Sequence, residues 1–151
     1  MEEIIKDKSL MEHTRSVKEL LGLRVLSRSG EKIGAVKDVR YSLRAMNIKG
    51  IFTRHPKIGN LYIGSDYIEI ISKDSILLSI DPAILNMNKK VITHQGKVLG
   101  KVKKIERVGN TNIISKMHIR RFLHKAFVIK LSDIGNNGDS IILKEGRHEQ
   151  K

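Results

Sequence analysis

The 151-residue sequence carries 29 Lys and Arg against 16 Asp and Glu, which gives a formal net charge of +13 at pH 7. Hydrophobic residues make up 40% of the chain, which is typical of a globular protein and excludes a disordered one. The lack of Cys excludes a disulfide framework, a thiolate zinc site and a cysteine nucleophile. No apolar run approaches the roughly 20 residues of a membrane-spanning helix, and the acidic start has no signal-peptide pattern, so we expect a cytoplasmic protein.

A short helix is predicted near the start of the chain. Ser16-Val17-Lys18-Glu19 fits the capping box S-x-x-E, in which the first and last residues satisfy each other's backbone amides. Gly22 follows two leucines and is typical of the position just after a helix. We therefore expect residues 1–16 to form a flexible or helical leader, and the helix that follows it to enter the first strand.

The chain contains an internal repeat. Residues 22–39 align with residues 88–105, which lie 66 positions further on. Each copy opens with a short β-branched segment, Val25-Leu26 in the first and Val91-Ile92 in the second, that leads into a turn. Such short segments with glycine punctuation are typical of β-strands. The chain is therefore interpreted as a tandem duplication of one β-rich unit.

Four glycines recur at matching places in the two copies. Gly30 and Gly96 fall in turns, where glycine supplies a positive φ without steric cost. Gly34 and Gly100 fall inside the next strand, where glycine marks a bulge, a sharp bend or the close approach of another backbone. We expect all four to be structural. The apolar residues along these segments are compatible with a long, bulged strand that buries one of its faces; they are Ile33, Val36, Val39, Tyr41, Leu43, Leu99, Val102 and Ile105.

The rest of each copy continues in short strands. Ser65-Asp66 is aligned with Ser132-Asp133, the segment 136–139 is a typical hairpin turn, and Asp81-Pro82 is the natural join between the copies. The further predicted strands are 47–54, 61–63 and 76–80 in the first copy and 113–117, 127–129 and 141–143 in the second, while 66–70 and 132–136 are interpreted as turns or one-turn helices.

These elements predict an all-β protein of two tandem small β-barrels with a short helical leader, because evenly spaced short strands favour a barrel or sandwich over βαβ units. The expected divisions are a leader over 1–16, a first barrel over 17–81, a second barrel over 82–146 and a tail over 147–151.

The two copies resemble the PRC-barrel family, which is named for the photosynthetic reaction centre H subunit and includes the C-terminal domain of the ribosome maturation factor RimM. The resemblance extends over roughly residues 17–144, and Asn88-Lys89-Lys90 replaces the Leu-Gly opening in the second copy. The segments that carry it are Leu20-Leu21-Gly22, Gly30, Ile33-Gly34-Ala35-Val36, Ser65-Asp66 and Asp74–Leu78 in the first copy, and Gly96, Leu99-Gly100-Lys101-Val102, Ser132-Asp133 and Asp139–Leu143 in the second.

The resemblance implies two PRC-type barrels that act as a scaffold without catalysis. Tandem proteins of this kind resemble archaeal cell-division proteins of the CdpB type, which are implicated as adaptors that join SepF, the membrane anchor of FtsZ. The implied partner is therefore a SepF-like division protein, with indirect association with the membrane at the division site. The RimM member of the family implies an alternative, a factor associated with RNA or the ribosome.

The residues themselves offer no pattern for catalysis. The sequence has no G-x-x-x-x-G-K-[ST] loop and no G-x-S-x-G elbow. Its six His residues lack metal-ligand spacing, and acidic residues are sparse in the second half. We therefore expect no enzyme, no catalytic residues, no cofactor and no metal.

Positive charge is concentrated in the second copy. Residues 81–151 have a net charge of +9 against +4 for residues 1–80, and Glu106 is the only acid between Lys89 and Lys125. Such a field favours an anionic partner, either an acidic protein, lipid head groups or RNA, although it also suits a solvated surface. Phe122 and Phe127 are interpreted as core residues, which disfavours base stacking. The candidate anionic-partner surface, called the basic surface below, consists of Lys101, Lys103, Lys104, Arg107, Arg120 and Arg121.

Two equivalent strands are candidates for contacts between copies of the chain. An incompletely closed barrel leaves strand edges free, and free edges pair with other chains. A homodimer formed in this way is compatible with an adaptor role, although the same residues are also interpreted as barrel core. The candidate edge or interface residues are Leu61, Tyr62, Ile63, Phe127, Val128 and Ile129.

Overall fold

The computed structural model describes residues 13–148 and divides the chain into two compact units, Met1–Ile80 and Asp81–Lys151. The division falls between Ile80 and Asp81, one residue before the boundary expected from the sequence. Most of the predicted leader lies outside the described residues. Of the part inside, Arg15 donates a hydrogen bond from its guanidinium to the Ser72 carbonyl oxygen at 2.7 Å.

The predicted helix is present as α2, Val17–Leu20. The Ser16 amide donates to Glu19 Oε2 at 2.7 Å, and the Lys18 amide donates to Ser16 Oγ at 3.3 Å. These contacts form the capping box that the sequence predicts. Leu20 is buried, so the helix turns one side chain into the first unit.

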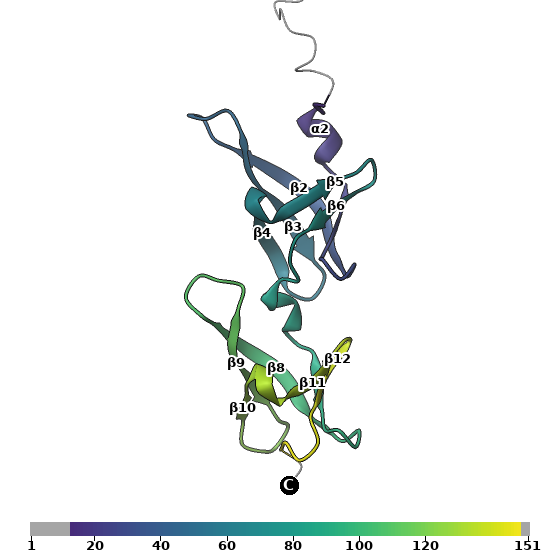
Figure 1. Cartoon of the computed structure of the whole chain (residues 1–151), viewed down its shortest axis with the longest axis vertical. Helices are drawn as coiled ribbons and strands as arrows, with labels where there is room; N and C mark the ends of the chain where they lie inside the picture. The colour runs from purple at the N-terminus through teal and green to yellow at the C-terminus, as the bar shows by residue number, and fades with distance from the viewer. Residues whose placement is uncertain (1–12, 149–151) are drawn as a thin grey trace, which may run out of the picture. The chain divides into compact units, whose positions relative to one another are not determined.

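The first unit is a single six-stranded sheet that curls into a half-barrel (Figure 1). Its strands lie in the order β4-β3-β2-β1-β6-β5, and all neighbours are antiparallel except β1 and β6. The elements are β1 Arg24–Leu26, β2 Lys32–Tyr41, β3 Ile48–His55, β4 Gly59–Gly64, the 3-10 helix η1 Ser65–Tyr67, β5 Ile68–Ile71 and β6 Ser75–Leu78.

The second unit repeats this topology, with the strand order β10-β9-β8-β7-β12-β11 and a parallel pair of β7 and β12. The all-β class and the tandem, barrel-like organisation predicted from the sequence are therefore confirmed. The elements are the 3-10 helix η2 Ala83–Asn86, β7 Lys90–Ile92, β8 Val98–Arg107, β9 Ile114–Arg120, β10 Phe127–Ile129, the 3-10 helix η3 Leu131–Asp133, β11 Ile134–Asn137 and β12 Ser140–Leu143.

The repeat extends to single hydrogen bonds at the opening of each unit. The Gly22 amide donates to the Val36 carbonyl at 2.9 Å, and the Asn88 amide donates to the Val102 carbonyl at 3.0 Å. Gly22 has φ +82° and Asn88 has φ +63°. Asparagine tolerates this left-handed region better than most residues. Asn88 therefore preserves the turn that opens the unit although the Leu-Gly sequence is missing.

The four glycines have the structural roles that the sequence predicts. Gly30 and Gly96 have φ of +88° and +91°. A Cβ on Gly34 would lie 2.5 Å from the Arg54 carbonyl oxygen, and one on Gly100 would collide with the carbonyl oxygen of Arg120. The long strand therefore crosses its neighbour so closely at these two points that no side chain fits.

Two strands were missed in the sequence. Residues 66–70 and 132–136 form more than turns, because η1 leads into β5 and η3 leads into β11. These strands lie at the ends of the sheets and are mostly exposed, so they lack the alternation of buried and exposed residues that marks a strand. The alignment of Ser65-Asp66 with Ser132-Asp133 is also wrong by one residue. The Ser79 amide donates to the Tyr67 carbonyl, and the Lys144 amide makes the equivalent bond to the Asp133 carbonyl. Asp133 therefore corresponds to Tyr67 rather than to Asp66.

Each unit has a core of aliphatic side chains from the concave face of its sheet. Ile33, Val36 and Val39 are buried as expected. Tyr41, the last residue of β2, and Leu43, in the turn that follows, are 58% and 83% exposed because the chain leaves the core there. In the second unit the buried cluster comprises Val91, Leu99, Val102, Met117, Ile119, Ile129, Ile141 and Leu143.

Candidate anionic-partner surface

The basic surface lies on the outer face of β8 and β9. Val102 is buried, whereas Lys101, Lys103 and Lys104 are exposed. The pairing with β9 shifts between Val102 and Lys104, so Lys103 is the extra residue of a bulge. Because of this bulge, both Lys103 and Lys104 face solvent, and the side chain of Ile105 points inward again and packs against the core.

Two cations face each other directly across the strands at the start of this surface. Lys101 is the cross-strand partner of Arg120. Like charges in this position are destabilising, so the arrangement does not serve the fold. Within residues 13–148, neither side chain takes part in an ion pair, and the same holds for Lys103. This part of the surface therefore presents uncompensated positive charge.

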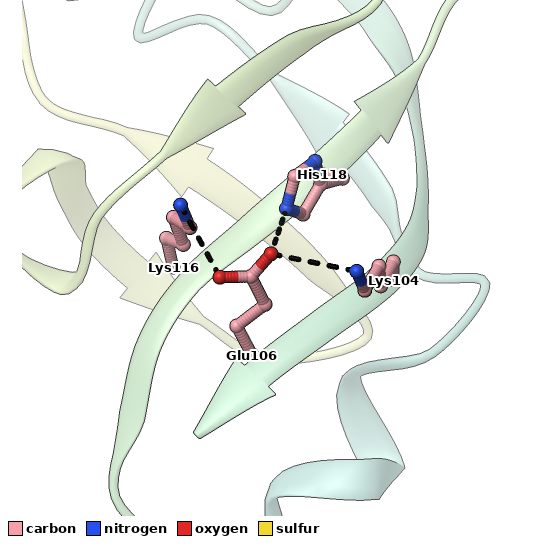
Figure 2. Close-up of polar contacts among 4 residues, drawn as sticks. All are labelled: Lys104, Glu106, Lys116 and His118. Carbon is pink, nitrogen blue, oxygen red and sulfur yellow. Dashed lines mark hydrogen bonds and ion pairs between the residues drawn. The ribbon is translucent and has the colours of Figure 1, made fainter. Parts of the chain in front are cut away.

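At the other end of the surface, the carboxylate of Glu106 contacts Lys104, Lys116 and His118, as Figure 2 shows. Glu106 Oε1 lies 2.8 Å from His118 Nε2 and 3.5 Å from Lys104 Nζ, and Glu106 Oε2 lies 3.2 Å from Lys116 Nζ. The hydrogen bond from His118, followed by that from Lys116, holds the pKa of Glu106 below its ordinary value of 4.5. Glu106 is therefore ionised at neutral pH and restrains Lys104, which leaves the beginning of β8 as the more positive end.

Two shallow hollows at that positive end share Phe122 as a lining residue. Their volumes are about 370 Å³ and about 310 Å³, and Val98, Gly100 and Phe122 line both. The first is also lined by Lys90, Lys101, Lys103 and Arg120, and the second by Lys97, Leu99, Arg121 and His124.

Phe122 is not a core residue, which corrects the sequence interpretation. It lies in the loop between β9 and β10 and is 86% exposed, and Leu123 beside it is 85% exposed. Phe127 is half-buried and packs against the core, as expected, with the Arg121 guanidinium 5.8 Å from its ring centroid. The exposed apolar pair of Phe122 and Leu123, beside the cation-lined hollows that Phe122 lines, is the feature that sequence reasoning missed.

The six predicted residues of the basic surface are thus only partly brought together. Lys101, Lys103 and Arg120 line one hollow and Arg121 lines the other. Lys104 is turned toward Glu106, and Arg107 is exposed at the end of β8, opposite Ile114.

The first unit has a different outer face at the same positions. Counted back 66 residues, Lys101 corresponds to Ala35 and His118 to Phe52. The Arg40 guanidinium lies 5.3 Å from the Phe52 ring centroid, and the Phe52 and Tyr62 rings are 5.1 Å apart. The first unit therefore has an aromatic pair, Phe52 and Tyr62, where the second has His118 and Val128. Lys103 and Arg120 keep cationic counterparts in the first unit, Lys37 and Arg54, whereas Lys101 does not.

The candidate interface strands lie at the ends of the sheets. β4 pairs with β3 and β10 pairs with β9, and each is the first strand in its sheet order. Ile63 and Ile129 are buried in the cores, whereas Tyr62 and Val128 are 52% and 39% exposed. The edge interpretation therefore applies to Tyr62 and Val128, and the core interpretation applies to Ile63 and Ile129. Leu61 and Phe127 are half-buried.

In the described part of the chain, no three His, Asp or Glu side chains gather as ligands for a metal ion. None of the helices within residues 13–148 combines the length and apolar character needed to cross a membrane. No protein-family model matches the chain, and a comparison with curated proteins finds no match.

Proposed function

We propose that the protein is a non-catalytic adaptor that binds an acidic partner protein through the basic surface of its second unit. The observation that carries this proposal is the facing pair of Lys101 and Arg120, with Lys103 beside them and no carboxylate in contact within residues 13–148. Opposite potentials across an interface accelerate encounter and set orientation. Residues placed at a cost to the fold are best explained by what they bind.

The resemblance to the PRC-barrel family supplies the most specific version of this proposal. In that version the protein is an archaeal cell-division factor in the cytoplasm, recruited to the division site by a SepF-like partner. The aromatic pair of the first unit, Phe52 and Tyr62, offers a second and chemically different contact. The two units would then bind different proteins, as an adaptor requires, and pairing of the β4 or β10 edges would add a homodimer.

A second candidate function is association with RNA or the ribosome. The exposed ring of Phe122, which lines both cation-lined hollows, favours it, because single-stranded RNA is bound by aromatic stacking beside a positive groove. The resemblance to the RimM barrel points in the same direction.

One experiment separates the two candidates. The tagged full-length protein is captured from its own cells, and half of the lysate is treated with nuclease before mass spectrometry. Recovery of SepF-like and FtsZ-like proteins that survives nuclease supports the adaptor. Recovery of ribosomal proteins that disappears with nuclease contradicts it and supports the RNA-associated factor.

A further inference from the structure

The β9–β10 loop presents two adjacent large apolar side chains to solvent. Phe122 and Leu123 are 86% and 85% exposed, and Val98 on β8 is 57% exposed and lines both hollows with Phe122. Leu123 has φ +57°, a region that non-glycine residues seldom occupy. Single exposed apolar residues are common on protein surfaces, but a contiguous group marks an interaction site.

Lys and Arg side chains line both hollows together with Val98 and Phe122, and no acidic side chain lines either hollow within residues 13–148. Long Lys and Arg side chains can keep their charged ends at a polar boundary while an apolar neighbour goes deeper. The Lys and Arg residues that line the hollows are Lys90, Lys97, Lys101, Lys103, Arg120 and Arg121.

We propose that this loop docks on an anionic lipid bilayer, with Phe122 and Leu123 inserted at the boundary between head groups and acyl chains. The Lys and Arg side chains of the hollows then contact the lipid phosphates. Stable attachment to a bilayer needs two signals, and an apolar insertion combined with a basic patch supplies both. This contact goes beyond the adaptor function, because it needs no partner protein.

The composition of the loop favours a bilayer over RNA. Leu123 is as exposed as Phe122 but has no π face on which a base could stack. Binding of single strands uses successive aromatic platforms, and the second unit has only one other aromatic residue, Phe127, which is half-buried. An adjacent aromatic and aliphatic pair suits insertion into lipid.

The first unit lacks this feature at the equivalent loop. Pro56 and Lys57 stand where the second unit has Phe122 and Leu123. The first unit does have two exposed apolar residues elsewhere, Leu43 and Met46, in the loop between β2 and β3. These residues line neither of the two hollows and provide a matched control within the same chain.

The test is co-sedimentation of the full-length protein with vesicles of phosphatidylglycerol and phosphatidylcholine in equal parts, and with vesicles of phosphatidylcholine alone. We expect binding to the anionic vesicles, weakened by salt. The variant Phe122→Ser/Leu123→Ser should bind at least about tenfold less, because each side chain loses much of its transfer free energy. The variant Leu43→Ser/Met46→Ser should bind like the wild type.

A fluorescence measurement gives an independent readout, since the sequence contains no Trp. Phe122→Trp should shift its emission to shorter wavelength on anionic vesicles, whereas Leu43→Trp should keep the emission of a water-exposed indole. No binding to anionic vesicles, an equal loss in both serine variants, or preferential binding of an oligouridine by the wild type would each overturn the proposal. Phe122→Ser/Leu123→Ser retains every charge of the basic surface, so we expect it to keep the acidic-partner contact while it loses vesicle binding. Failure of the bilayer proposal is therefore distinguishable from failure of the proposed adaptor function.

Discussion

Asp38 and Lys104 occupy the same position in the two copies, and each forms an ion pair with the residue two places further along its strand. Asp38 Oδ2 lies 3.3 Å from Arg40 Nε, and Lys104 Nζ lies 3.5 Å from Glu106 Oε1. The two pairs therefore have opposite polarity on the same outer face. Exposed pairs contribute little to stability, so this face is free to change its charge without loss of the fold.

The close crossing at Gly34 predicts a sharp loss of stability on substitution. Gly34→Ala should destabilise the first unit by about 1–3 kcal/mol or more, because the added Cβ meets the Arg54 carbonyl oxygen and a backbone atom cannot move aside. Gly64→Ala is the control, since a Cβ there has nothing within 4 Å. Urea denaturation measures both, and equal stability of the two variants would refute the close-crossing explanation.

The positive φ of Asn88 leads to a prediction about the stability of the second unit. Its φ of +63° is one that glycine adopts without cost, so Asn88→Gly should stabilise the second unit or leave it unchanged. Asn88→Val should destabilise it by about 1–2 kcal/mol or more, since a β-branched residue is strained in this region. Thermal unfolding of the two variants provides the comparison. A tolerated valine would show that the turn does not need the left-handed conformation.

The buried hydroxyl of Thr93 leads to different stability predictions for a substitution that removes the hydroxyl and one that keeps it. Thr93 is 2% exposed, and its Oγ1 accepts a hydrogen bond from the Lys97 amide at 3.0 Å. Thr93→Val leaves that amide without its acceptor and should cost about 1–3 kcal/mol. Thr93→Ser should cost less, because Ser27 accepts from the Glu31 amide in the same way in the first unit. Chemical denaturation measures the free energy of unfolding of both variants. If side-chain volume alone mattered, the smaller Ser would lose more stability than Val, and that result would contradict the prediction.

Glu106 predicts a pH-dependent difference in stability. Its pKa is lowered in the folded protein, so its ionised form contributes stability that is present above the unfolded-state pKa and is lost as pH falls through the folded-state pKa. The difference between wild type and Glu106→Gln should therefore be greatest near neutral pH and vanish below the lowered pKa. Melting temperatures measured across this range check the sign, and a difference that grows toward acid would contradict it.

Much of the fold could be predicted from the sequence because the duplication places the same constraints twice. Gly34 and Gly100 marked the close crossings, and Ser16 with Glu19 marked the only α-helix of the described residues. The strand beginning at Ile134 was missed because an exposed edge strand has no buried face to impose a periodic pattern.

The candidate site was predicted only in its charges. Phe122 was assigned to the core because aromatic residues are usually buried, whereas the β9–β10 loop directs this one to solvent. One signal was available: Arg120-Arg121 precede the apolar pair, His124-Lys125 follow it, and the first copy has Pro56-Lys57 in its place. A segment charged on both sides is poorly suited to a core.

The basic surface of the second unit is the proposed contact with the acidic partner. Its most direct test repeats the nuclease-treated capture with two charge reversals at equivalent repeat positions, Lys103→Glu/Arg120→Glu and Lys37→Glu/Arg54→Glu. All four side chains are exposed, so melting temperatures should stay near that of the wild type. We predict that the second-unit variant loses its partner by about tenfold or more, while the first-unit variant retains it. Equal recovery of the partner by both variants would show that the basic surface of the second unit is not the contact.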